Sequence, residues 1–243
     1  MGSQFSGGPA AAPRIFNVPA IVLWTMSIII LVYVAIALLP PRLALTIEHV
    51  LGVTPGLFVK GPEANGGLIS MIRPLFTTTL VHGSPQHLAM NSIWLLAFGA
   101  PVARRLGADM KKEALSSSSI FLIFFALSGA AASLFFILFH QRDYALLVGA
   151  SGSISGLLGA VVRFGLRRPA FFTPGPQPVL PLLDPSVLAA SAVVIVLNAM
   201  TPLLGGAMGA SNVAWEAHIG GFLFGLLTFP LFDRWARLTA HTS

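Results

Sequence analysis

Six apolar segments, each long enough to cross a lipid bilayer, are the feature of this chain that most limits how it can fold. An α-helix rises about 1.5 Å per residue and the hydrocarbon core of a bilayer is about 30 Å thick, so one crossing needs about 20 mostly apolar residues. We therefore expect an all-α membrane protein with six transmembrane helices. The first segment is longer than the apolar region of a signal peptide, about 7–15 residues, so we expect it to be retained. The segments are 18–40, 84–101, 118–140, 145–163, 186–206 and 214–232.

The composition excludes an ordinary soluble domain. Of the 243 residues, 55% are hydrophobic and 9% are charged, whereas a soluble domain carries about 25% charged residues. The net charge of +6 does not indicate nucleic-acid binding, because no stretch is dense in Lys and Arg with interleaved aromatic residues. The chain has no cysteine and no H-E-x-x-H spacing, so the sequence predicts neither a disulfide framework nor a metal site.

The basic residues between the segments predict the orientation. With the N-terminus in the cytoplasm, ten Lys and Arg residues fall on the inner side and four on the outer side. Cytoplasmic loops carry such an excess, so we expect both termini in the cytoplasm. The inner residues are Arg14, Arg104, Arg105, Lys111, Lys112, Arg163, Arg167, Arg168, Arg234 and Arg237, and the outer ones are Arg42, Lys60, Arg73 and Arg142.

The segments form one predicted membrane domain, residues 18–233, with a short tail at each end. Residues 1–17 are rich in Gly, Ala and Pro and are predicted to be disordered, and residues 234–243 form a second cytoplasmic tail. In the long first outer loop, residues 42–51 are predicted to form a short helix at the membrane surface. The outer loop 204–213 has three glycines and no charge, so we expect it to be mobile.

Four polar residues lie inside the apolar segments at one depth: His87 and Asn91 on the second, Ser151 on the fourth and His218 on the sixth. In the predicted topology these three segments begin on the outer side. Ser151 is then about six residues into its helix, and the four side chains lie about 5 to 11 Å below the outer surface. Polar groups in the hydrocarbon region are costly, so this coincidence indicates a functional site.

The residue types in this layer indicate acyl-transfer chemistry. A serine hydroxyl becomes nucleophilic when a neutral imidazole takes its proton, which assigns these roles to Ser151 and His218. The small-residue pairs Gly152–Gly156 and Gly221–Gly225 predict that the fourth and sixth helices touch closely. Such a contact would bring the serine to the histidine.

His87 and Asn91 lie four residues apart and project from one helix face. Together with the N–H of Ser151, they can donate hydrogen bonds to the oxyanion of a tetrahedral intermediate. No acidic residue lies at this depth to orient His218, so we interpret the pair as a dyad and not a triad. Taken singly, Ser and Asn in membrane helices commonly hydrogen-bond the backbone or a neighbouring helix, and we interpret Asn198 in this way.

Three short motifs resemble those of the rhomboid family of intramembrane proteases. Gly149-Ala150-Ser151-Gly152 resembles the G-x-S-G motif around the nucleophile. Ala217-His218-Ile219-Gly220-Gly221 resembles the A-H-x-x-G motif of the catalytic histidine. The stretch VHGSPQHLAMN, which contains His82, His87 and Asn91, is similar to the pattern that begins the second helix in the family.

The resemblance covers about residues 70–232 and implies a rhomboid-like bundle of six helices. It implies a serine endopeptidase that hydrolyses peptide bonds in or near the transmembrane segments of membrane-protein substrates, with no cofactor and no metal. Ser151 would be the nucleophile and His218 the general base, and the loop 204–213 would cap the site beside a substrate entry at the fifth helix. The oxyanion residues would be His87 and Asn91, and the supporting residues His82, Gly149, Gly152, Ser155 and Gly221.

The chain departs from the family pattern at three positions. Ser155 stands where the family usually has Tyr or Phe packed on the catalytic histidine. Either His218 is held less firmly, or Ser155 hydrogen-bonds to it. Ser155 also shares a helix face with Ser151 and stays an alternative nucleophile. Ile72 stands where a Trp is common in the first loop, and Ala103 replaces a frequent acidic residue.

Two other functions compete with the protease. A catalytically inactive relative would bind transmembrane clients, but such relatives tend to lose the serine or the histidine, and this chain has both. A small transporter or channel predicts ionisable residues along a path through the membrane, and here none lies in the middle of a segment. The expected partners are transmembrane substrates and the lipid bilayer, with no nucleic acid, in a multi-pass protein of a bacterial plasma membrane.

Overall fold

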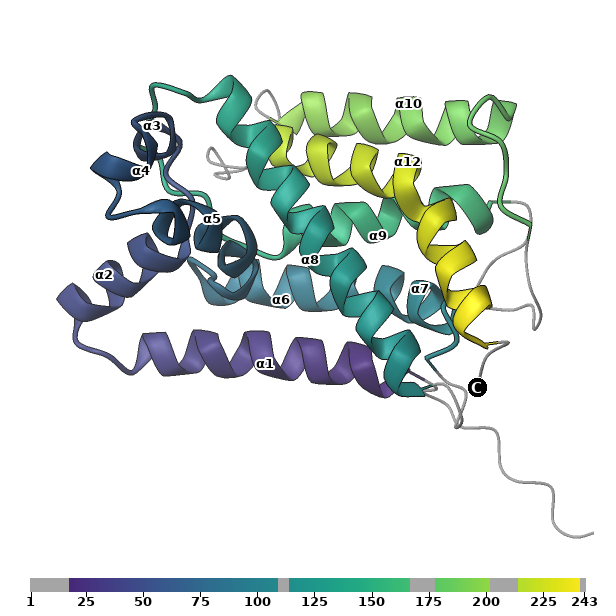
Figure 1. Ribbon diagram of the computed structural model, residues 1–243, viewed down its shortest axis with the longest axis horizontal. Coiled ribbons are helices and arrows are strands. Elements are labelled where there is room, and N and C mark those ends of the chain that lie inside the picture. The colour runs from purple at the N-terminus through teal and green to yellow at the C-terminus, as the bar shows by residue number, and fades with distance from the viewer. Residues whose placement is uncertain (1–17, 109–113, 167–177, 202–213, 241–243) are drawn as a thin grey trace, which may run out of the picture.

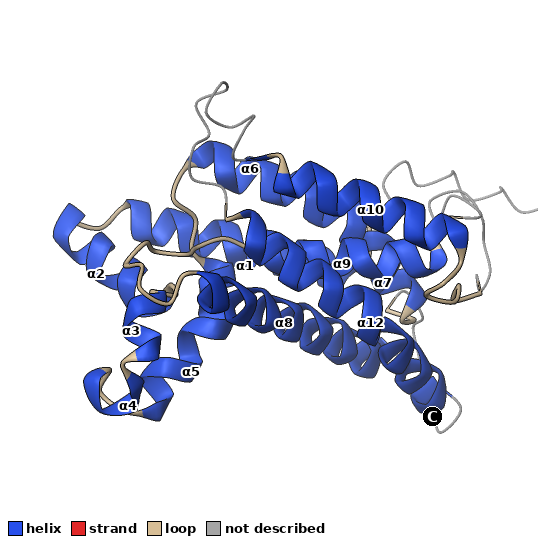
Figure 2. Ribbon diagram, turned by 90° about the horizontal axis from the view of Figure 1, so that it is seen from above, coloured by secondary structure: helices blue, strands red, loops and turns tan. Residues whose placement is uncertain are grey.

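The computed structural model describes residues 18–108, 114–166, 178–201 and 214–240. These residues are helical almost throughout (Figure 1), and Figure 2 shows the same bundle from above. Among them, one isolated antiparallel bridge joins Val53 to Leu147. The helices are α1 (Ala20–Ala37), α2 (Pro41–Leu51), α3 (Pro55–Val59), α4 (Gly61–Ala64), α5 (Leu68–Thr77), η1 (Thr78–Leu80), α6 (Pro85–Trp94), η2 (Leu95–Gly99), α7 (Ala100–Arg105), α8 (Ala114–Phe139), α9 (Ser151–Phe164), α10 (Pro185–Ala199) and α12 (Trp215–Ala240).

Among the described residues, three helices are long and apolar enough to cross a membrane. They lie over Ala20–Ala37, Ser116–Phe139 and Trp215–Thr239, in α1, α8 and α12. The helices α9 and α10 are apolar but shorter, with 14 and 15 residues. The expectation of an all-helical protein with several apolar helices, as in a multi-pass membrane protein, is confirmed. The number of six crossings stays a prediction.

The second predicted segment is one continuous helical run made of α6, η2 and α7. The run begins at Pro85, where the Oγ of Ser84 accepts a hydrogen bond from the N–H of His87 (3.2 Å) and caps the first turn. Proline suits this position because the N–H that it lacks has no partner within the helix there. A π-helical turn over Leu95–Gly99 joins α6 to α7. The run lies beside α1 (Figure 1).

Four short helices, α2 to α5, gather at one end of the molecule (Figure 1). Of these, α2 (Pro41–Leu51) matches the short helix predicted over residues 42–51. The short helices pack against α8 through a small apolar cluster that includes Val53, Leu75 and Ile137. This contact holds the first loop against the bundle.

The core of the bundle is formed by α8, α9 and α12, and α9 buries ten of its 14 residues. Aromatic rings fill much of the contact between α8 and α12. The ring of Phe124 meets those of Phe229 and Phe232 edge-on, at centroid distances of 5.8 and 4.9 Å, which is a favourable geometry for aromatic pairs. Because lipid tails are as apolar as these side chains, close packing holds such helices together in a membrane.

The fourth predicted segment, 145–163, begins later than expected. The backbone of Leu147 pairs with that of Val53, with N···O distances of 2.8 and 3.0 Å, so the chain is still extended there. Gly149 then turns the chain with a φ of +122°, and α9 begins at Ser151. The prediction that Ser151 lies about six residues into its helix is therefore wrong.

The sixth predicted segment is longer than expected, since α12 continues to Ala240 and into the residues assigned to the second tail. Two further predictions fall on other parts of the chain. The disordered tail over 1–17 and the mobile loop over 204–213 lie outside the described residues.

Candidate active site

Ser151 is the first residue of α9, and Gly149 shapes the turn before it. The φ of +122° at Gly149 lies in the left-handed region, which residues with a side chain rarely adopt. Its N–H donates to the carbonyl of Thr78 (3.0 Å), and a Cβ at this position would lie 2.6 Å from Cε1 of His87. Glycine thus serves both the turn and the close approach of the imidazole. The helix start also leaves the N–H groups of the first turn without intrahelical partners beside the serine.

Paired glycines let α9 and α12 meet backbone to backbone next to Ser151. A Cβ on Gly221 would overlap the carbonyl oxygen of Gly152, and a Cβ on Gly225 would overlap that of Gly156. The four glycines are those of the small-residue pairs Gly152–Gly156 and Gly221–Gly225, from which the sequence predicts a close helix contact, and the structure contains that contact. It places the first turns of α12 beside the start of α9.

His218 lies between two polar side chains from different helices. Its Nε2 is 2.9 Å from the Oγ of Ser151, and its Nδ1 is 3.0 Å from the Oδ1 of Asn198 on α10. The amide nitrogen of Asn198 donates to the carbonyl of Val194 (2.9 Å), so the amide oxygen faces the imidazole. An oxygen acceptor requires a proton on Nδ1, which leaves the lone pair of Nε2 to accept the serine hydroxyl. Neutral His218 therefore has the tautomer that a general base needs.

Asn198 is the residue of this site that the sequence analysis does not assign. The interhelical hydrogen bond that we expect for it exists, but its partner is the candidate base, His218. The absence of Asp and Glu at this depth does not exclude a neutral amide, whose oxygen can also accept a hydrogen bond from the histidine. The depth of Asn198 in the membrane could have indicated this role. Asn198 lies eight residues from the outer end of its predicted segment, or about 12 Å.

His87 and Asn91 converge on the backbone that leads into Ser151. A Cβ built on Gly149 would lie 2.7 Å from Nε2 of His87 and 3.6 Å from Nδ2 of Asn91. Asn91 is buried, and its Nδ2 has no hydrogen-bond partner among the described residues. Buried donors are nearly always paired, so this unpartnered donor of α6, which faces the turn before α9, is suited to an oxygen atom of a bound molecule.

His82 is buried in the turn that precedes α6. Its Nε2 accepts a hydrogen bond from the N–H of Ala150 (3.4 Å), and its ring centroid lies 5.0 Å from that of His87, with the planes tilted by 57°. The contact with Ala150 ties His82 to the turn that carries Ser151. His82 thus contacts the residue that precedes the candidate nucleophile.

Ser155 lies one helical turn after Ser151 on α9 and is half-buried. Both ring nitrogens of His218 are engaged, Nε2 by Ser151 and Nδ1 by Asn198. His218 is therefore directed to Ser151. Among the described residues, no hydrogen bond joins Ser155 to His218, so the alternatives in which Ser155 holds His218 or replaces the nucleophile have no support from a contact. Across the described residues, no cluster of three or more His, Cys, Asp or Glu side chains is arranged to hold a metal ion.

Comparison with known families matches residues 70–234 to the family model described as Rhomboid domain. The match covers more than half of the chain and contains every residue of the site described above, from His82 to His218. Among curated proteins, no match was found.

Proposed function

Because the chain belongs to the rhomboid family, we propose that it is an intramembrane serine endopeptidase that hydrolyses peptide bonds in or near the transmembrane segments of other membrane proteins. One observation carries this proposal. The Oγ of Ser151 lies 2.9 Å from the Nε2 of His218, and the hydrogen bond at Nδ1 leaves that Nε2 free of a proton. This is the arrangement of an activated serine nucleophile.

The proposed reaction passes through an acyl-enzyme. The Oγ of Ser151 attacks the carbonyl carbon of the scissile bond while its proton moves to Nε2 of His218. The tetrahedral intermediate collapses, the C–N bond breaks, and His218 gives the proton to the leaving amine. Water then attacks the ester as its proton moves to His218, and the returning proton releases Ser151 and the new carboxyl end.

The proposed oxyanion site is formed by the donors at the start of α9. The unpartnered Nδ2 of Asn91 and the imidazole of His87 both face this backbone. The first-turn N–H of Ser151 adds a donor whose partner is not supplied by the helix. Hydrogen bonds that strengthen as the carbonyl oxygen gains charge lower the barrier to attack.

We further propose that the chain crosses the membrane six times with both termini in the cytoplasm of a bacterial cell. The bias of Lys and Arg supports this orientation, and α9 and α10 supply the two shorter crossings. Ser151 then lies near the outer surface. The substrate would enter beside α10.

The test is cleavage of a single-span reporter that carries Ala and Gly near its outer boundary. Wild-type protein purified in detergent is compared with Ser151→Ala, Ser155→Ala and His218→Ala. We expect cleavage to be lost in Ser151→Ala and His218→Ala and kept in Ser155→Ala. If wild type leaves several reporters and a serine-reactive phosphonate unchanged, the protein is an inactive relative that binds transmembrane clients, and the proposal is wrong.

A further inference from the structure

We propose that Asn198 is a positioning residue that holds His218 in the tautomer and orientation of a general base. This role rests on the proposed protease function and adds a third member, from a third helix, to the serine and histidine. Asn198 hydrogen-bonds to His218, and His218 hydrogen-bonds to Ser151. Asn198 acts on the chemistry only through the histidine.

The hydrogen-bond pattern around Asn198 has one consistent assignment. An amide NH₂ group can only donate and an amide oxygen can only accept. The Nδ2 of Asn198 is 2.9 Å from the carbonyl oxygen of Val194, one turn earlier on α10, so the NH₂ group is at that end. The Oδ1 is then the atom 3.0 Å from Nδ1 of His218. The backbone of α10 therefore fixes the amide, and the amide fixes the proton on the imidazole.

The surroundings of Asn198 support a role beyond packing. Its helix is mostly exposed: Leu188, Val193 and Leu197 have exposed fractions of 51%, 57% and 58%. A polar amide on an apolar helix is costly in lipid unless it finds a partner. Asn198 is half-buried, and the partner that it finds on the neighbouring helix is His218.

Asn198 can also replace the function of the aromatic residue that the family usually has at the position of Ser155, which is to hold the imidazole in place. A ring packed on the imidazole would limit its rotation by contact. Here the rotation of His218 is limited by hydrogen bonds at both nitrogens, to Ser151 and to Asn198. Without the second bond, the imidazole can rotate and can carry its proton on Nε2, and that tautomer cannot accept the serine proton.

The kinetic test compares Asn198→Leu, which has a similar size and no acceptor, with Asn198→Asp, which keeps the acceptor. We expect Asn198→Leu to lower kcat about 10- to 100-fold, part of the ~10²–10⁴ that a general base supplies, with KM changed less than about twofold. Asn198→Asp should recover most of this loss. Its carboxylate also stabilises the imidazolium, so the acidic limb of its pH–rate profile should move to higher pH.

The matched control is Ser191→Ala, on the same helix and one turn past Val187. The Oγ of Ser191 is buried without a hydrogen-bond partner among the described residues, and it lies two turns from Asn198. We expect Ser191→Ala to keep the kcat, KM and pH profile of the wild type. A loss in this variant equal to that of Asn198→Leu would show that any change in α10 impairs the enzyme, and would overturn the proposal.

A second readout does not depend on turnover. Nitrogen-15 NMR of labelled histidine separates imidazoles protonated on Nδ1 from those protonated on Nε2, and His218→Ala identifies the signal. We expect neutral His218 to be protonated on Nδ1 in the wild type and to become a tautomer mixture in Asn198→Leu. Wild-type protein that cleaves reporters but shows the same tautomer and the same kcat in Asn198→Leu overturns the role of Asn198. An uncleaved reporter with the expected tautomers overturns the protease function instead.

Discussion

Close to Ser151, two buried nitrogens have no hydrogen-bond partner among the described residues, Nδ2 of Asn91 and Nδ1 of His82. The other ring nitrogen of His82 accepts a hydrogen bond from Ala150, whereas the amide nitrogen of Asn91 can only donate. A buried donor without a partner is destabilising to the folded protein, by about 1–3 kcal/mol. Such a cost is expected where a group is kept ready for a charge that develops only during the reaction.

Removing this donor should impair the reaction without weakening the fold. We expect Asn91→Ala to lower kcat about 10²- to 10³-fold, as the loss of one oxyanion donor does. The thermal midpoint should not fall, because the amide nitrogen forms no hydrogen bond that the substitution removes. Ser92→Ala is the control, since Ser92 Oγ donates to the backbone carbonyl of Leu88 within its own helix (2.9 Å). If Asn91→Ala unfolds at a lower temperature in proportion to its lost activity, Asn91 is a packing residue.

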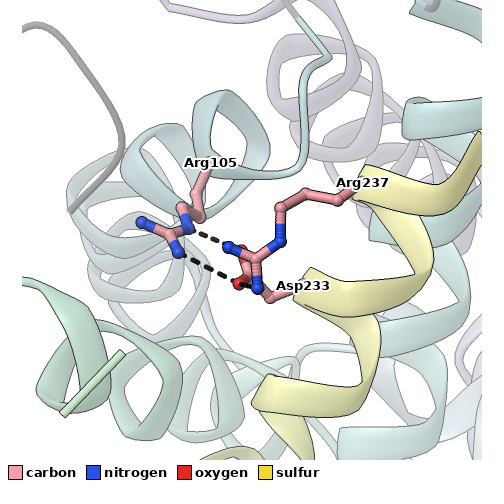
Figure 3. Close-up of polar contacts among 3 residues, drawn as sticks. All are labelled: Arg105, Asp233 and Arg237. Carbon is pink, nitrogen blue, oxygen red and sulfur yellow. Dashed lines mark hydrogen bonds and ion pairs between the residues drawn. The ribbon is translucent and has the colours of Figure 1, made fainter. Parts of the chain in front are cut away.

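The helix α12 is tied to its neighbours at both ends as well as along the glycine contact. At the end far from α2 to α5, the carboxylate of Asp233 accepts hydrogen bonds from Nε and Nη2 of Arg105 on α7, at 2.5 and 3.0 Å. Arg237, one turn later, reaches the same carboxylate at 2.6 Å (Figure 3). At the other end, His140 lies between Asp143 (2.6 Å) and Glu216 (3.1 Å). These ties fix the helix that carries His218.

The buried carboxylate and the exposed arginine of this cluster should contribute unequally. The side chains of Arg105 and Asp233 are 7% and 2% exposed, whereas that of Arg237 is 58% exposed. We expect Asp233→Ala to lower the free energy of unfolding by about 3–5 kcal/mol, because a buried guanidinium loses its carboxylate. Arg237→Ala should cost less than about 1 kcal/mol. Unfolding in detergent micelles measures both, and equal losses would contradict the burial argument.

The His140 contact should make stability depend on pH. Burial lowers the pKa of His140, but the hydrogen bonds and charges of Asp143 and Glu216 outweigh it, so the pKa is raised. His140 is the residue directly after the end of α8 and is not part of that helix. A histidine with a raised pKa stabilises the fold fully below its unfolded pKa of about 6.5, and this stabilisation is lost as the pH rises through the folded value.

The measurement is the thermal midpoint of wild type and His140→Gln across the pH range. Glutamine is neutral at every pH, so the wild type should be the more stable protein at about pH 5.5, and the difference should shrink above neutrality. His49→Gln is the control, because His49 lies in the exposed α2 helix. A difference that stays constant with pH, or grows as the pH rises, would show that the charge on His140 does not stabilise the contact.

Taken as a whole, the molecule shows which parts of a membrane protein its sequence can predict. The long apolar helices follow from composition and length, and the paired glycines predict the contact between α9 and α12. The late start of α9 depends on backbone pairing between Val53 and Leu147, which are far apart in sequence. The role of Asn198 depends on how α10 is rotated against α12, and an almost uniformly apolar helix gives no such information.

The path of the chain through the membrane can be tested with single cysteines, because the natural chain has none. Glu63→Cys lies in α4, Leu166→Cys follows α9, and Arg234→Cys lies near the end of α12, all at exposed positions. A maleimide that cannot cross membranes should label only Glu63→Cys in intact spheroplasts, because the excess of basic residues places the other two inside. Inside-out vesicles should reverse this result, and detergent should expose all three. Labelling of Leu166→Cys from outside would show that the 14-residue α9 does not cross, and labelling of Arg234→Cys in place of Glu63→Cys would invert the topology and put Ser151 near the cytoplasm.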